Sequence, residues 1–155
     1  MAFTADYEVL IERLDDELRL APRPAADLFA KIIASVCTRI PLIGKSGKVD
    51  PIGRMIDAGA WADAALAVVE LELPAWKLRR LVHESGEWLC SLSRQPNLPL
   101  ELDDVVDGRH EKLPLAILRA FIEARHRIEA VEPRTSGVPQ LRAGSACAIC
   151  CDNFA

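Results

Sequence analysis

Three cysteines lie within five residues near the end of the chain, at Cys147, Cys150 and Cys151. As thiolates, cysteines bind zinc or Cu(I), and they also exchange disulfides. A zinc ion needs a fourth ligand, which Asp152, a histidine or a second chain would have to supply. The cluster therefore predicts a metal- or redox-responsive protein with zinc or copper at these cysteines. The alternative is a terminal segment without a fixed role.

A second chemical pattern consists of Asp104, Asp107 and His110, which recur at a spacing of three residues. Carboxylates and an imidazole are plausible ligands for a divalent metal, and a carboxylate can also orient a histidine that acts as a base. These residues would suit a small metal-dependent hydrolase if they converge. No second histidine follows at the zinc-protease spacing, however, and such residues also serve as caps before a helix. We therefore assign no catalytic residue from the sequence.

A third pattern places basic residues beside an aromatic ring, in Trp76, Lys77, Arg79 and Arg80. Proteins that bind single-stranded nucleic acids use such combinations. The whole chain, however, has a net charge of -4 and a pI near 5.4, which is the wrong sign for phosphate binding. We therefore do not expect nucleic-acid binding and interpret these residues as a candidate interaction surface, with a solvated strand face as the alternative.

Gly44, Lys45 and Ser46 match the end of a phosphate-binding P-loop. The motif requires another glycine five residues before Gly44, where this chain has Arg39, and it should follow a strand instead of a helix. We therefore predict no bound nucleotide or other cofactor here, and expect residues 41–49 to form a flexible loop.

The composition predicts one globular domain, because 50% of the 155 residues are hydrophobic and 27% are charged. No leader sequence is recognisable, and the longest apolar run, residues 58–69, is too short for a membrane span. Five cysteines, an odd number, favour reduced thiols. We therefore expect a soluble, cytoplasmic protein that does not enter a membrane.

The clearest structural signal is a hairpin over residues 76–94, in which Ser85 and Gly86 separate two runs of strand-forming residues. A two-residue loop that ends in glycine is typical of a type I′ turn, which needs positive φ at both positions. Closing the turn with Glu84 opposite Glu87 pairs His83 with Trp88, Leu81 with Cys90 and Arg79 with Leu92. An isolated hairpin is marginal in water, so helices must cover it.

The apolar periodicity predicts those helices. They are expected at residues 6–20, 24–40, 50–57, 60–73 and 113–131. Asp50 and Pro51 form a typical helix start, and a third short strand is an option near residues 98–102. The predicted fold is thus an α+β domain over residues 1–131, with about five helices around a two-stranded antiparallel hairpin. Residues 132–155 are rich in Pro, Gly and Ser and are expected to form a flexible, cysteine-containing tail.

Residues 57–125 contain the segments AGAWADAALAVVELELPAWKLRRL, GEWLCSLSRQPNLP and LPLAILRAFIEAR. In this part, under half of the chain, the sequence resembles small hypothetical proteins of alphaproteobacteria that have no assigned activity. The resemblance implies a bacterial, cytoplasmic origin and carries over no site residues.

No nucleophile–base pair, complete metal motif or phosphate loop emerges from these patterns. The sequence therefore favours a non-catalytic protein-interaction or regulatory module, whose partner is unknown and which could act as a homodimer. The metal- or redox-responsive protein is the first alternative, and the small hydrolase is the second.

Overall fold

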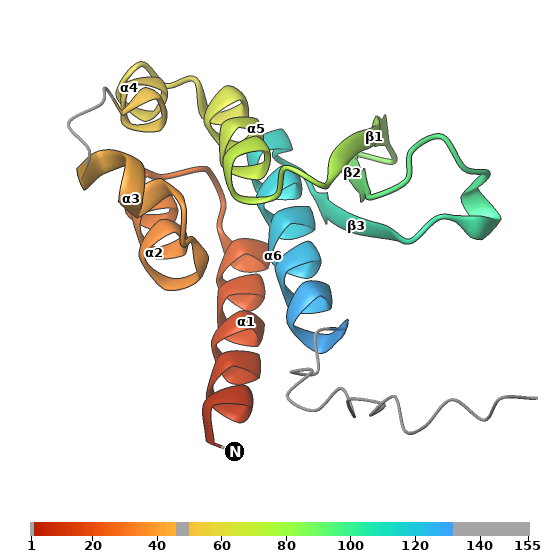
Figure 1. The fold of residues 1–155 in the computed structure, drawn as a ribbon. Coiled ribbons are helices and arrows are strands. Elements are labelled where there is room, and N and C mark those ends of the chain that lie inside the picture. The colour runs from red at the N-terminus through yellow and green to blue at the C-terminus, as the bar shows by residue number, and fades with distance from the viewer. Residues whose placement is uncertain (1, 46–49, 132–155) are drawn as a thin grey trace, which may run out of the picture.

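The computed structural model describes residues 2–45 and 50–131, and this part of the chain has an α+β fold (Figure 1). It contains six α-helices: α1 (Ala2–Leu20), α2 (Ala26–Val36), α3 (Ile40–Lys45), α4 (Pro51–Asp57), α5 (Trp61–Glu72) and α6 (Leu113–Val131). A three-stranded antiparallel sheet has the order β1 (Lys77–Glu84), β2 (Glu87–Ser93) and β3 (Val105–His110). A short 3₁₀ helix, η1 (Leu100–Leu102), lies between β2 and β3.

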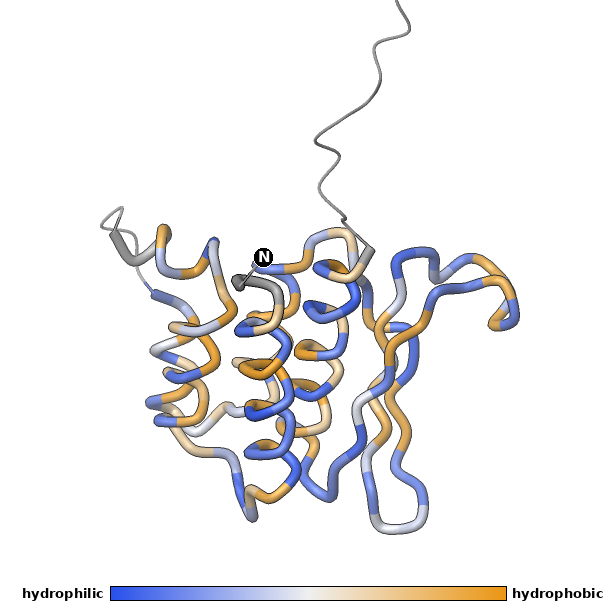
Figure 2. The backbone as a smooth tube through the Cα atoms, turned by 90° about the horizontal axis from the view of Figure 1, so that it is seen from below, coloured by the Kyte–Doolittle hydropathy of each residue, from blue (hydrophilic) through white to orange (hydrophobic). Residues whose placement is uncertain are grey.

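Helix α6 is the centre of the fold, with the sheet on one side and α1 and α5 on the other (Figure 1). Its middle is therefore buried almost all round. The buried residues are Leu115, Ala116, Ile117, Leu118, Ala120, Phe121, Ile122 and Ala124. No helix covers the other face of the sheet in the described part of the chain (Figure 2). The sheet is thus an outer layer that rests on α6.

The predicted hairpin is confirmed at its turn. Ser85 and Gly86 have φ values of 55° and 85°, the positive values that a type I′ turn requires. Glu84 lies opposite Glu87, and His83 pairs with Trp88 as predicted. The turn residues therefore fix the register of this end of the sheet.

The predicted pairing of Arg79 with Leu92 is wrong. The register shifts between Leu78 and Arg80, so that Leu78 pairs with Leu92 and Arg79 lies in a β-bulge. A bulge bends its strand and redirects a side chain. Here the guanidinium of Arg79 is directed to the connection between β2 and β3, where it donates three hydrogen bonds.

The sheet has three strands instead of the predicted two, and the third is not near residues 98–102. Residues 100–102 form η1, and the added strand is β3, which pairs with β2. Its buried face consists of Val106, Gly108 and His110. Gly108 allows α6 to approach the backbone of β3, because a Cβ at Gly108 would lie 2.2 Å from the carbonyl oxygen of Ala116. Aspartate and glycine are rare in strands. Because β3 contains Asp107 and Gly108, its sequence did not predict a strand.

The sixth helix is α3, where a flexible loop was predicted over residues 41–49. The Glu72 carboxylate explains its start. It accepts hydrogen bonds from the backbone N–H groups of Thr38 at 2.9 Å, Arg39 at 2.8 Å and Ile40 at 2.6 Å. These donors precede or begin α3, so Glu72 caps this helix from α5. The short P-loop-like motif ends α3 at Gly44 and Lys45, and Ser46 lies outside the described residues.

Helix α4 begins as predicted. The Asp50 side chain accepts hydrogen bonds from the backbone N–H groups of Ile52 and Gly53, both at 3.1 Å, and Pro51 occupies the first turn. An aspartate cap followed by proline is therefore enough to locate a helix start from the sequence.

Substitution of Gly108 with alanine tests the contact between β3 and α6. The added Cβ would meet backbone atoms of Ala116 and Ala120, which cannot rotate away as a side chain does. We expect the free energy of unfolding, measured in urea, to fall by about 3 kcal/mol or more. The matched control is Arg109→Ala on the exposed side of the same strand, which should change it by less than about 0.5 kcal/mol. An equal effect of both substitutions would contradict this packing.

Candidate interaction surface

Within the connection between β2 and β3, residues 95–104 extend away from the body of the protein (Figure 1). We call it the leucine loop, because Leu98, Leu100 and Leu102 are 37%, 59% and 71% exposed. The apolar character of its tip is visible in Figure 2. Single exposed leucines are common on protein surfaces, but three at alternate positions of one protrusion form a concentrated apolar surface.

Arg79 anchors this loop to the sheet. Its guanidinium donates hydrogen bonds to the carbonyl oxygens of Pro96 at 3.0 Å and Leu98 at 2.8 Å, and to the carboxylate of Asp103 at 2.5 Å. The Asp103 side chain is fully buried, and that of Arg79 is only 15% exposed. One guanidinium therefore ties both halves of the loop to the bulge of β1.

Ser93 completes the anchor. Its hydroxyl lies 2.7 and 2.6 Å from the two carboxylate oxygens of Asp103, and it accepts a hydrogen bond from the backbone N–H of Gln95 at 2.9 Å. The buried carboxylate thus has both a charged partner and a hydroxyl donor, as a buried charge requires. We call Arg79, Ser93 and Asp103 the loop anchor.

Further contacts restrict the loop internally and at its end. Backbone hydrogen bonds of 3.0 Å join Leu98 to Gln95 and Leu102 to Pro99. At the far end, Arg127 of α6 pairs with the Asp104 carboxylate. Together with the fixed φ of Pro99, these contacts hold the exposed leucines in one arrangement. Such a surface loses little conformational freedom when it binds.

The structure separates the four residues of the predicted basic surface. Trp76 is 3% exposed and belongs to the hydrophobic core. Arg79 is part of the loop anchor, whereas Lys77 and Arg80 are exposed on β1. The two exposed cations remain available to a partner, but the aromatic ring beside them does not.

Asp104, Asp107 and His110 do not converge. Asp107 lies on the outer face of β3 and accepts a hydrogen bond from the Ser91 hydroxyl at 2.5 Å. His110 is buried, and its Nδ1 accepts a hydrogen bond from the backbone N–H of Lys112 at 2.9 Å. Asp104 is paired with Arg127. In residues 2–45 and 50–131, no group of three acidic, histidine or cysteine residues could hold a metal ion.

The predicted metal ligands Cys147, Cys150 and Cys151 lie outside the described residues. The two described cysteines, Cys37 and Cys90, are buried free thiols. Burial raises the pKa of each thiol to about 12, and nearby carboxylates, Glu72 for Cys37 and Asp107 for Cys90, add to the rise. Both thiols are therefore protonated at neutral pH, which makes them poor nucleophiles and metal ligands.

Comparison of the chain with protein-family models, curated proteins and solved structures finds no match. The resemblance to small alphaproteobacterial proteins therefore stays a prediction. None of the described helices is both long and apolar enough to cross a membrane.

Replacing Arg79 with alanine tests the loop anchor. The substitution leaves the buried Asp103 carboxylate without its cation and two carbonyl groups without their donor. We expect the free energy of unfolding to fall by about 2 to 4 kcal/mol, because removing one partner of a buried pair leaves an uncompensated charge. Denaturant titration measures this change.

The matched control for this test is Arg80→Ala, which removes the same side chain from the neighbouring, exposed position of β1. It should change the free energy of unfolding by less than about 0.5 kcal/mol. If Arg79→Ala lowered the free energy of unfolding as little as Arg80→Ala, the loop would not depend on this anchor.

Proposed function

We propose that this protein is a non-catalytic interaction module and that the leucine loop inserts into an apolar groove of a partner protein. The observation that carries the proposal is the combination of three exposed leucines with a buried ionic anchor. The buried ion pair between Arg79 and Asp103 holds the leucine loop in place, although the three leucines of that loop are exposed and add nothing to the hydrophobic core. Such an arrangement suits a surface that is preorganised for binding.

Burial of the leucines would supply the affinity. Each leucine that moves from water into an apolar groove contributes about 1.5 to 3 kcal/mol. Because the loop is already ordered, little of this is lost to fixing the backbone. Central apolar anchors of this kind commonly dominate the binding energy of an interface.

The shape of the loop favours a different protein over a second copy as its partner. A two-fold dimer places the same surface of each copy against itself, and two protruding surfaces have poor shape complementarity. A groove on another protein accommodates a protrusion better. A homodimer, which the sequence left open, is therefore an outcome that the experiment must distinguish.

The two alternatives from the sequence receive no support from the described residues. The metal- or redox-responsive protein depends on Cys147, Cys150 and Cys151, so that prediction stays untested. The hydrolase requires Asp104, Asp107 and His110 to meet, but β3 directs Asp107 and His110 to opposite faces of the sheet.

The double substitution Leu100→Ser/Leu102→Ser tests the proposal. A photo-crosslinking amino acid at position 98 of the full chain, expressed in its native host, should give one discrete adduct with another protein. Loss of two buried leucines should weaken the complex by about a hundredfold or more and remove this adduct. Gel electrophoresis and mass spectrometry of the adduct measure the outcome.

The matched control is Val9→Ser/Leu20→Ser, because these α1 side chains are 53% and 76% exposed, similar to the two leucines. This variant should leave the adduct unchanged. Native mass spectrometry of the purified chain supplies the remaining comparison. A homodimer that dissociates in the leucine-loop variant would show that the partner is a second copy of this chain. An adduct that is insensitive to both variants would contradict the proposal.

A further inference from the structure

The outer edge of β1 is a second surface feature, separate from the leucine loop. In the sheet order β1–β2–β3, the strands β1 and β3 each have one edge without a neighbouring strand (Figure 1). The backbone N–H and C=O groups along such an edge can pair with another strand, so proteins commonly cover it. The two edges of this sheet differ in how the described residues cover them.

Helix α6 closes the edge of β3. The guanidinium of Arg119 donates a hydrogen bond to the carbonyl oxygen of Arg109 at 2.7 Å, and that of Arg127 donates one to the carbonyl oxygen of Val105 at 3.3 Å. Both carbonyl groups belong to β3, along which α6 packs. Two side chains of the central helix therefore occupy hydrogen-bonding groups of this strand.

The edge of β1 has no such cover in residues 2–45 and 50–131. A two-residue turn has a hydrogen-bonded pair at its base, here Glu84 and Glu87, and bonded pairs alternate with non-bonded pairs along an antiparallel ladder. The backbone groups of Leu81 and His83 are therefore directed away from β2. Within the described residues, no side chain or loop forms a hydrogen bond with these groups.

The side chains of this edge are complementary to those of a second copy. Arg80, Val82 and Glu84 lie at alternate positions of β1, on the face of the sheet away from α6. An antiparallel second copy with Val82 opposite Val82 places Arg80 of each chain opposite Glu84 of the other. Opposite charges at such positions attract each other. Neither Arg80 nor Glu84 has an ion-pair partner among the described residues.

The backbone agrees with this register. Pairing about Val82 sets Leu81 opposite His83 of the second copy, so the outward N–H and C=O groups of both strands meet as hydrogen-bonded pairs. A shift by two residues in either direction keeps the alternation of these groups, but it sets Glu84 opposite Leu78 or Val82. Both ion pairs are lost in these shifted registers, so the charges select pairing about Val82.

Charged residues at a strand edge often prevent such pairing, but their position here does not. Lys77 and Arg79 lie outside the paired segment 80–84, and the loop anchor holds Arg79. Glu84 also lies opposite Glu87 of its own chain, which places two like charges together. Arg80 of a second copy would offset this repulsion.

We propose that two copies of this chain pair through β1 and join their sheets into one continuous antiparallel sheet. A two-fold axis at Val82 relates the copies, and two-fold dimers are the commonest soluble oligomers. Pairing of exposed strand edges is also an established mode of protein recognition. The dimer uses none of the residues of the leucine loop, so the inference is independent of the proposed partner binding.

Sedimentation velocity of the reduced full chain tests the dimer. A strand-edge contact buries less area than a standard interface, so we expect a dissociation constant on the order of 100 µM. Monomer should therefore change to dimer over a concentration range of about 10 to 1,000 µM. Unfolding measurements on dilute protein report the single chain. A chain that stays monomeric over the whole range would overturn the proposal.

Charge reversal locates the interface. Arg80→Glu and Glu84→Arg each replace two attractive pairs with two repulsive ones, and both positions are exposed, so the fold should stay intact. Each variant should dimerise at least about tenfold more weakly than the unmodified chain. An equimolar mixture of the two variants should form a heterodimer about as stable as the original dimer, because every cross-strand pair again joins opposite charges.

Arg109→Glu is the matched control, since it makes the same change in charge as Arg80→Glu on the same face of the sheet, but on β3. This variant and Leu100→Ser/Leu102→Ser should leave the dissociation constant within about twofold. Equal weakening by Arg109→Glu would indicate a general charge effect, and failure of the mixed variants to associate would contradict the register. Loss of the dimer in the leucine-loop variant would place the interface there. Each of these three results would overturn the proposal, and only the last bears on partner binding by the leucine loop.

Discussion

The backbone contact between Gly108 and α6 is the constraint on which the rest of the structure depends. A Cβ at this position would lie within 2.3 Å of backbone atoms in both Ala116 and Ala120. The absence of a side chain therefore lets β3 lie directly against the central helix. Because β2 and β1 are joined to β3 through the sheet, this single approach sets the distance and orientation of the whole outer layer, including the leucine loop.

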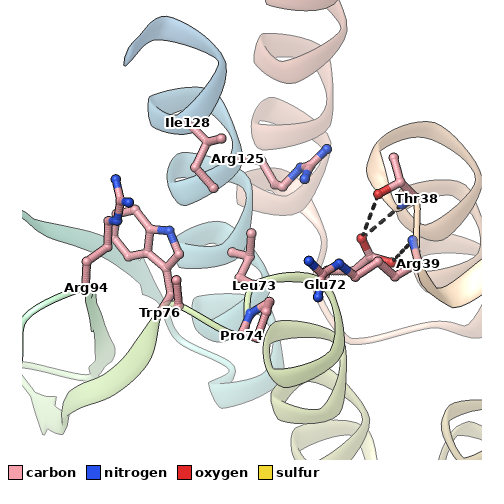
Figure 3. Close-up of a pocket in the computed structure, with 10 residues that line it drawn as sticks. Thr38, Arg39, Glu72, Leu73, Pro74, Trp76, Arg94, Arg125 and Ile128 are labelled. Carbon is pink, nitrogen blue, oxygen red and sulfur yellow. Dashed lines mark hydrogen bonds between the residues drawn. The ribbon is translucent and has the colours of Figure 1, made fainter. Parts of the chain in front are cut away.

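Two buried carboxylates, Asp103 and Glu72, each fix the chain nearby. Asp103 binds Arg79 and Ser93 and thereby holds the leucine loop. Glu72 accepts hydrogen bonds from three backbone N–H groups and holds the start of α3 (Figure 3). Burial of a carboxylate is costly unless it is fully hydrogen-bonded. In this protein, both buried carboxylates meet this requirement.

Local signals predicted local structure well. The Ser85–Gly86 turn, the hairpin register near it and the Asp50 cap of α4 each follow from residues close together in the chain. Non-local contacts account for the errors. The bulge at Arg79 depends on Asp103, and α3 depends on Glu72, 32 residues beyond Ile40.

The candidate surfaces could be predicted only in part, for the same reason. The alternating leucines at 98, 100 and 102 are visible in the sequence, but only the structure shows that no element of the described residues covers them. Trp76 and Arg79 are adjacent to basic residues, yet packing and the loop anchor occupy them.

The central claim is that the leucine loop is a preorganised binding surface. The most direct test is ¹⁵N relaxation of the backbone amides of residues 97, 98, 100, 101 and 102 in the isolated full chain. We predict order parameters near those of rigid backbone, about 0.85, similar to the strands of the sheet. Values below about 0.6 would show a loop that moves freely on the ps–ns timescale and would contradict the account.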